Sequence, residues 1–174
     1  MNYLKMVAIN IALLLSCSTA SAFEVVSQHG KKRSFREMTN SGTWLVVMLW
    51  AHDCIPCEKQ KPILNRFSSK NYNKGVVVVG LSTDNKSERP KAKAAMERSS
   101  AKFHNYLYQG NDFASDYRTL TGTSFIGTPT YLIYTPTGTL SGLHVGPIKL
   151  PALDNHFANK TKETSPALSP GIFR

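Results

Sequence analysis

The chain has 174 residues, of which 41% are hydrophobic and 18% are charged, an ordinary composition for one globular domain with a core of its own. Its formal net charge is +10, from 21 lysines and arginines against 11 acidic residues. The basic residues are scattered along the chain and do not alternate with aromatic residues, so we expect a solvated basic surface and no nucleic-acid partner.

The first 22 residues have the pattern of a secretory signal peptide. An apolar core over residues 7–15 follows a positive start, and Ala20-Ser21-Ala22 forms an A-x-A cleavage site before Phe23. The apolar run is too short to span a membrane. A rival interpretation makes Cys17 the lipidated cysteine of a lipoprotein, but the residues before it fit that motif poorly. We therefore expect a soluble protein exported to the periplasm.

The cysteines narrow the chemistry further. Of the three in the chain, Cys17 lies in the predicted leader, so the mature protein carries only Cys54 and Cys57. One pair excludes a structural disulfide framework. Export places the pair outside the reducing cytosol, where a dithiol can be kept oxidised or must be supplied with electrons.

The remaining chain is predicted to form one domain over residues 23–160, followed by a disordered tail over 161–174 that contains Pro166, Pro170 and Gly171. Apolar runs and turn residues predict strands and helices in alternation. In chain order we expect a hairpin of strands 24–27 and 33–35, strand 43–50, helix 55–69, strand 76–81, helix 88–102, strand 103–108, helix 113–120, a turn and strand over 127–134, strand 139–145 and helix 150–159. The continuous β-branched run 76–79 is typical of a parallel strand buried on both faces.

The segment most suited to chemistry is Trp50-Ala51-His52-Asp53-Cys54-Ile55-Pro56-Cys57, where a predicted strand hands over to a predicted helix. The unpaired backbone N–H groups and the dipole of a helix N-terminus favour a thiolate on Cys54. Cys57, one turn further along, is placed to attack a mixed disulfide on Cys54 and release the product. This spacing predicts thiol–disulfide exchange.

At these residues the chain resembles the thioredoxin superfamily, in particular its exported TlpA/ResA-like members, whose active-site pattern is close to W-A-x-W-C-x-P-C. Trp50, Ala51, Cys54, Pro56 and Cys57 match that pattern, and Pro62 matches the proline that kinks the following helix. Gly127-Thr128-Pro129-Thr130 matches a second signature of the family. The resemblance implies an α/β, thioredoxin-like fold: a central mixed β-sheet flanked by helices, with an N-terminal β-hairpin and a TlpA-type inserted helix and strand.

The resemblance also implies roles for individual residues. Pro129 would follow a cis peptide bond and, with Trp50 and Pro56, position the substrate, while the backbone of Thr128 would pair with an extended substrate strand. Taken alone, Pro129 would be interpreted as an ordinary trans proline in a turn, because cis bonds are a minority state; the cis prediction depends on the cysteine motif upstream. The expected redox-tuning residues are His52, Asp53, Glu58 and Lys59.

Two departures from the family pattern concern proton transfer and thiol acidity. Family members carry a buried acid six residues before the first cysteine or a glutamate three residues after the second, and here those positions hold Met48 and Gln60. Proton transfer at Cys57 would then use water, Glu58 or Lys59. Asp53 replaces the usual tryptophan and disfavours a thiolate on Cys54, whereas protonated His52, Lys59 and the helix N-terminus favour it.

The leading hypothesis is an exported thiol–disulfide oxidoreductase that reduces a dedicated envelope client. We expect it to act as a monomer and to be re-reduced by a membrane electron donor. It would need no cofactor beyond the redox-active Cys54–Cys57 disulfide. One alternative is an oxidase that donates its disulfide to client thiols. Another is a copper-binding or assembly component, with Cys54, Cys57 and His52 or His144 as ligands. A closed zinc site lacks further ligands. A peroxidase would need a P-x-x-x-[TS]-x-x-C pattern, which the eight residues ending at Cys54 do not contain.

Overall fold

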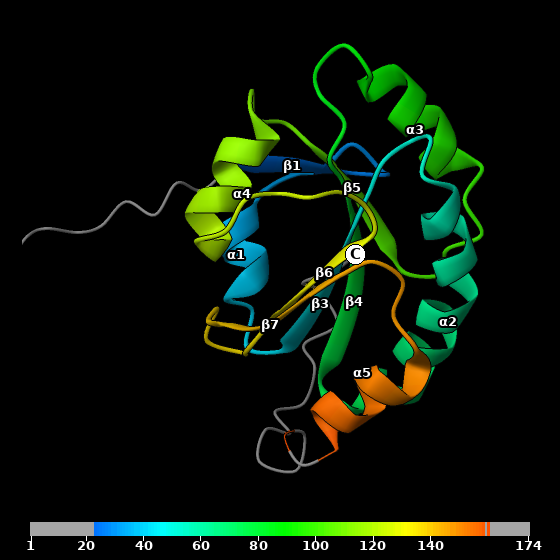
Figure 1. Cartoon of the computed structure of the whole chain (residues 1–174), viewed down its shortest axis with the longest axis vertical. Coiled ribbons are helices and arrows are strands. Elements are labelled where there is room, and N and C mark those ends of the chain that lie inside the picture. Colours follow the sequence, from blue (N-terminus) through cyan, green and yellow to red (C-terminus); the bar gives the residue numbers. More distant parts are fainter. Residues whose placement is uncertain (1–22, 159, 161–174) are drawn as a thin grey trace, which may run out of the picture.

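The computed structural model describes residues 23–158 and residue 160, and the predicted signal peptide (1–22) and tail (161–174) lie outside them. A seven-stranded sheet runs through the molecule in the order β2-β1-β5-β4-β3-β6-β7, with helices on both faces (Figure 1). The strands are β1 (Glu24–Ser27), β2 (Lys32–Ser34), β3 (Trp44–Trp50), β4 (Val76–Ser82), β5 (His104–Tyr108), β6 (Thr130–Tyr134) and β7 (Leu140–Val145). The helices are α1 (Phe35–Thr39), α2 (Ile55–Asn71), the 3₁₀ turn η1 (Tyr72–Lys74), α3 (Arg89–Glu97), α4 (Phe113–Thr121) and α5 (Leu150–Phe157).

The sheet is mixed, as predicted. β3 pairs with β4 in parallel, and β4 pairs with β5 in parallel. The other neighbours are antiparallel: β1 with β2 and β5, β3 with β6, and β6 with β7. Every residue of β3 and β4 is buried, which explains their nearly unbroken apolar sequences.

Alternate residues of β3 point to two separate cores, because side chains alternate across a strand. Val46, Met48 and Trp50 belong to a core with residues of α2, α3 and α5. Leu45 and Leu49 belong to a core on the other face, with residues of α1 and α4. Figure 1 shows the two groups of helices on opposite sides of the sheet. The end of β3 is therefore fixed from both faces.

The N-terminal hairpin and the inserted elements support each other. β1 pairs on one side with β2 and on the other with β5, the strand that follows α3. The predicted second strand at 33–35 is shifted to Lys32–Ser34, since Phe35 begins the short helix α1. This helix was not predicted: its apolar residues Phe35 and Met38 are buried under the sheet, a tertiary contact that a five-residue sequence pattern does not reveal.

The helix predicted over 88–102 is shorter than expected and ends at Glu97. The segment after it is held by Asn65 of α2, whose side chain accepts a hydrogen bond from Lys102 N and donates one to Ser100 O. These contacts replace the backbone bonds of a longer helix. The other predicted elements differ from the structure by one or two residues at their ends. No helix among the described residues is both long enough and apolar enough to cross a membrane.

Candidate active site at the end of the central strand

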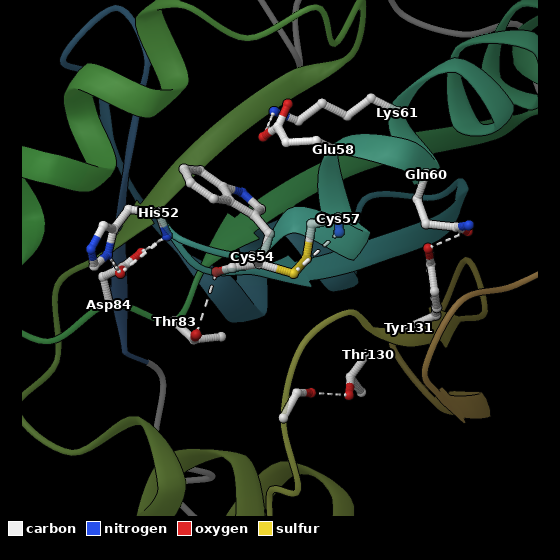
Figure 2. The surroundings of a disulfide bond; sticks show 12 residues. His52, Cys54, Cys57, Glu58, Gln60, Lys61, Thr83, Asp84, Thr130 and Tyr131 are labelled. Carbon is white, nitrogen blue, oxygen red and sulfur yellow. Dashed lines mark hydrogen bonds and ion pairs between the residues drawn. A yellow bond between two sulfur atoms is a disulfide. The ribbon is translucent and has the colours of Figure 1, made fainter.

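Cys54 and Cys57 form a disulfide bond where β3 leads into α2 (Figure 2). Cys54 occupies the position before the first residue of α2, and Cys57 lies in the first turn. Cys54 is 9% exposed and Cys57 is 1% exposed, so Cys54 is the more accessible of the two residues. The order of attack expected from the sequence stays a prediction.

The first turn of α2 presents a donor to the Cys54 sulfur. The backbone N–H of Cys57 donates a hydrogen bond to Cys54 Sγ over 3.2 Å. The same helix terminus carries a partial positive charge, and both features favour a thiolate on Cys54 once the disulfide is reduced. Asp53, whose carboxylate would oppose this, is exposed to water, which screens its charge.

His52 is held by a buried carboxylate that the sequence analysis did not single out. Its Nδ1 lies 2.5 Å from Asp84 Oδ1, and its backbone N–H donates to both carboxylate oxygens over 3.2 and 3.3 Å. Ser82 Oγ donates a further bond to Asp84 Oδ2 over 2.6 Å. The Asp84 side chain is 1% exposed. Asp84 therefore fixes the turn that carries Cys54.

The strand end is clamped from the same loop. Thr83 N donates to Trp50 O over 2.8 Å, and Thr83 Oγ1 approaches the same oxygen at 3.3 Å. Because Thr83 and Asp84 follow β4 directly, the parallel partner of β3 holds the turn between Trp50 and Cys54. This arrangement explains how a short connection keeps the two cysteines in place.

The same region offers the one group of possible metal ligands found among the described residues. Ligand atoms of His52, Asp84 and Glu88 lie within 4.8 Å of one another. Asp84 already accepts the bonds described above, so its lone pairs are largely used. His144, the other histidine considered for copper, lies on β7, where Nε2 is 3.3 Å from Pro147 O.

Neutral side chains occupy the two positions at which the resembled family places a carboxylate. Met48 is fully buried in β3. Gln60 is buried in α2, and its Oε1 accepts bonds from Tyr131 Oη over 2.8 Å and from Ile148 N over 3.0 Å. Burial raises the pKa of Tyr131, so its hydroxyl stays protonated and continues to donate. Neither position supplies a proton acceptor for Cys57.

An ion pair between Glu58 and Lys61 lies on another side of the cysteines (Figure 2). Lys61 Nζ donates to Glu58 Oε1 and lies 5.9 Å from the centre of the Trp50 ring. The Lys61 side chain is only 3% exposed, whereas that of Glu58 is 56% exposed. Lys59, the lysine predicted to tune the thiols, is exposed instead.

The loop before β6 completes the surroundings of the disulfide. The Thr128–Pro129 peptide bond is cis, and Pro129 is buried. Thr130 Oγ1 donates to Gly127 O over 2.6 Å, and Thr130 pairs with Leu49 of β3. This register places the proline beside the end of β3, where the cysteine turn begins.

One large apolar side chain between the cysteines and one before the cis-proline loop are exposed to solvent. Ile55, between the cysteines, is 71% exposed, and Ile126, just before the cis-proline loop, is 79% exposed. Pro56 is also exposed. Trp50, in contrast, is buried and belongs to the same core as the two cysteines.

The Trp50 ring packs against Gly80, at a position where a larger residue would collide with it. A Cβ on Gly80 would lie 3.0 Å from Trp50 Nε1 and 2.0 Å from Asn105 Oδ1. Trp50 Nε1 has no hydrogen-bond partner among the described residues. Gly80 lies on β4, opposite Met48 of β3. Because Gly80 has no side chain, the indole of Trp50 and the amide of Asn105 can both occupy the space beside it.

Two functional candidates were therefore missed from sequence, Asp84 and Lys61. Lys61 lies four residues after Cys57, the spacing that puts two side chains on one face of a helix, so its position could have been noticed. Asp84 carried no comparable signal, because its contact with His52 joins residues 32 positions apart.

Comparison with known proteins places this chain in a family. The sequence profile of the AhpC/TSA family matches residues 18–142. The thiol-disulfide oxidoreductase ResA of Bacillus thuringiensis (strain Al Hakam) is 34% identical over 65 residues, which are 37% of this chain and 36% of that protein. The chain thus matches only about a third of the length of these curated relatives.

Solved structures show the same fold over most of the chain. The thioredoxin domain of a thiol-disulfide oxidoreductase from Bacteroides vulgatus superposes with a TM-score of 0.64 at 23% identity, covering 80% of this chain and 95% of that one. StoA from Bacillus subtilis superposes with a TM-score of 0.57 at 19% identity, covering 79% of this chain and 96% of that one. The thioredoxin-like fold predicted from the sequence is confirmed.

Proposed function

Because this chain belongs to the AhpC/TSA family and carries a disulfide between Cys54 and Cys57 at the end of its central strand, we propose that it is a thiol–disulfide oxidoreductase. The observation that carries the proposal is the unequal exposure of the two disulfide-bonded cysteines at a helix N-terminus. Cys54 is the nucleophile and Cys57 is the resolving thiol. The local match to ResA, a protein named as a thiol-disulfide oxidoreductase, supports the same assignment.

In the reducing direction, the Cys54 thiolate attacks a sulfur of the client disulfide and expels the other client sulfur, which takes up a proton. A mixed disulfide then joins Cys54 to the client. Cys57 loses its proton and attacks Cys54 Sγ, so that the Cys54–Cys57 bond forms and the second client thiol leaves. Two electrons pass to the client, and the chain ends oxidised.

The surroundings suit an extended client segment. Thr128 precedes the cis-proline and is half-buried in the loop before β6, and we expect its backbone to pair with a client strand. The exposed side chains of Ile55 and Ile126 give that segment apolar contacts. Trp50 and Pro56 keep the cysteine turn in the shape that admits it.

We assign the reducing direction and place the protein outside the cytosol, in the periplasm, with a membrane thiol donor that restores the dithiol. The sequence pattern of residues 1–22 supports export. The client is a dedicated envelope protein with a disulfide to be opened. No step requires a metal ion.

The first experiment is an equilibrium titration of the mature protein with thiol redox buffers. A Cys54–Cys57 potential near or below about −270 mV supports a reductase, and one near about −120 mV supports an oxidase and overturns the assigned direction. Cys54→Ser and Cys57→Ser variants serve as controls that must lose the couple. The absence of a reversible couple in the wild type, or direct turnover of peroxide, overturns the proposed function.

A further inference from the structure

We propose that Lys61 stabilises the thiolate of Cys57 and that Glu58 moderates this effect, so that the pair replaces the buried carboxylates missing at Met48 and Gln60. This inference rests on the proposed function, because it assigns a positioning role for the resolving step. Neither residue reacts with the client. The ammonium acts through the electrostatic field that it creates at the first turn of α2.

The position of Lys61 supports this role. Lys61 and Cys57 are four residues apart and share one face of α2. Side chains of a helix lean toward its N-terminus, and Lys61 follows this rule, since its Nζ meets Glu58 and lies over the Trp50 ring. The ammonium is therefore drawn back to the level of the turn that holds the cysteines.

Unequal burial makes the pair act as a net positive charge toward the interior. The Glu58 carboxylate is 56% exposed, so water screens it, while the Lys61 side chain is 3% exposed and is screened much less. Cys57 is itself 1% exposed and lies on the buried side of the helix. Of these two charges, the less screened ammonium therefore contributes more to the electrostatic potential at Cys57.

The other ionisable groups around this turn do not provide the same effect. Asp53 and Lys59 are exposed to solvent. His52 is engaged by the Asp84 carboxylate. Tyr131, which approaches from β6, keeps its proton because burial raises its pKa.

The resolving step shows where this charge acts. When a client is bound to Cys54, the Cys57 thiol releases its proton to water and its thiolate attacks Cys54 Sγ. The Cys54–Cys57 bond forms, the Cys54–client bond breaks, and the client thiolate leaves and is protonated by water. Lys61 takes no part in the proton transfer, and its positive charge increases the fraction of Cys57 that is present as the attacking thiolate.

The test measures Cys57 alone. In a Cys54→Ala background, the thiolate of Cys57 is titrated by its ultraviolet absorbance, with and without the changes Lys61→Met and Glu58→Gln. Methionine keeps an apolar stem on Trp50 and removes the charge. A nearby positive charge lowers the pKa of a thiol by about one unit or more. Removing that charge in Lys61→Met should therefore lower the thiolate fraction of Cys57 near neutral pH about tenfold. Glu58→Gln should raise it.

Lys59→Met is the matched control, because it removes the same formal charge from the neighbouring, exposed position. Its shift should be less than a third of that caused by Lys61→Met. A Lys61→Met shift no larger than the control, or shifts of the same sign in Lys61→Met and Glu58→Gln, would overturn the inference. A merely structural role predicts loss of stability without shifts of opposite sign.

The outcome can be separated from the fate of the proposed function. If the wild-type protein shows a reversible couple with redox buffers but the variants do not shift Cys57 in opposite directions, only the role of Lys61 fails. If the wild type shows no couple, the oxidoreductase assignment fails whatever the titrations give. As a second readout, release of a small thiol from a Cys54 mixed disulfide should slow about threefold in Lys61→Met, because the tenfold smaller thiolate fraction is partly offset by the greater nucleophilicity of a thiolate with a higher pKa.

Discussion

Two acid–base pairs flank the disulfide, and they are built in opposite ways. In the His52–Asp84 pair the acid is buried, with a side chain 1% exposed, and the base is 18% exposed. In the Glu58–Lys61 pair the base is buried at 3%, and the acid is 56% exposed. Figure 2 shows the two pairs on different sides of the cysteines.

The difference in burial corresponds to a difference in bonding. Asp84 accepts bonds from two groups of His52 and from Ser82, so it holds backbone and side chain of the cysteine turn together. Lys61 has one carboxylate partner and one aromatic neighbour, and holds no backbone atom in the contacts described. The His52–Asp84 pair is therefore an anchor, which holds the cysteine turn by hydrogen bonds. The Glu58–Lys61 pair is a field pair, which acts through its charge. Mutations should therefore affect the two pairs differently.

The largest effect is expected at the anchor. Asp84→Asn keeps the shape of the side chain but turns an NH₂ group toward donors, so buried hydrogen-bonding groups lose their acceptor. We expect the free energy of unfolding to fall by about 3 kcal/mol. The measurement is urea unfolding of the oxidised protein, read as a change in midpoint at constant slope.

Asp53→Asn is the matched control, since it removes a carboxylate from the same turn at an exposed position. It should change stability by less than about 0.5 kcal/mol. Equal losses in the two variants would show that Asp84 is not an anchor.

A smaller effect is expected beneath Trp50, the ring that supports Lys61. In Gly80→Ala the new methyl group would meet Asn105 Oδ1 at 2.0 Å, so the amide and the indole must shift. Overpacking of this kind costs about 2 kcal/mol. Thermal and urea unfolding would measure the loss.

A double variant checks the cause. Asn105→Ala removes the closest obstacle, so Gly80→Ala should cost less in that background than in the wild type. If the two changes were additive, contact between Gly80 and Asn105 would not explain the loss.

The smallest effect on stability is expected at the Glu58–Lys61 pair. Lys61→Met replaces a buried charge with an apolar side chain of similar length, a change that is often neutral or stabilising. Glu58→Gln leaves the ammonium buried without its counter-charge, but the exposed carboxylate contributes little, and we expect a loss below about 1 kcal/mol. Unfolding in urea should therefore rank Glu58→Gln as more harmful than Lys61→Met.

The two pairs should therefore respond to mutation in opposite ways. In the His52–Asp84 pair, loss of the buried carboxylate of Asp84 should lower the stability. For the field pair, loss of the exposed member should cost more. A strong destabilisation by Lys61→Met would place it with Asp84 as an anchor.

The main elements and the reactive cysteine pair can be predicted from local sequence patterns. The apolar runs of β3 and β4 predict buried parallel strands, because only a strand covered on both faces tolerates them. The C-x-x-C spacing at a strand–helix junction predicts the Cys54–Cys57 pair, since its geometry depends on residues three positions apart. Local patterns of this kind contain their own structural information.

The charges that surround the cysteines, in contrast, depend on long-range contacts in the folded chain. Asp84 reaches His52 across 32 residues because β3 and β4 are parallel neighbours, and no spacing in the sequence reveals that contact. The burial of Lys61 and the exposure of Lys59 depend on which face of α2 packs against Trp50. The short helix α1 forms because the sheet covers Phe35 and Met38. Each outcome depends on distant parts of the chain that meet only in the folded protein.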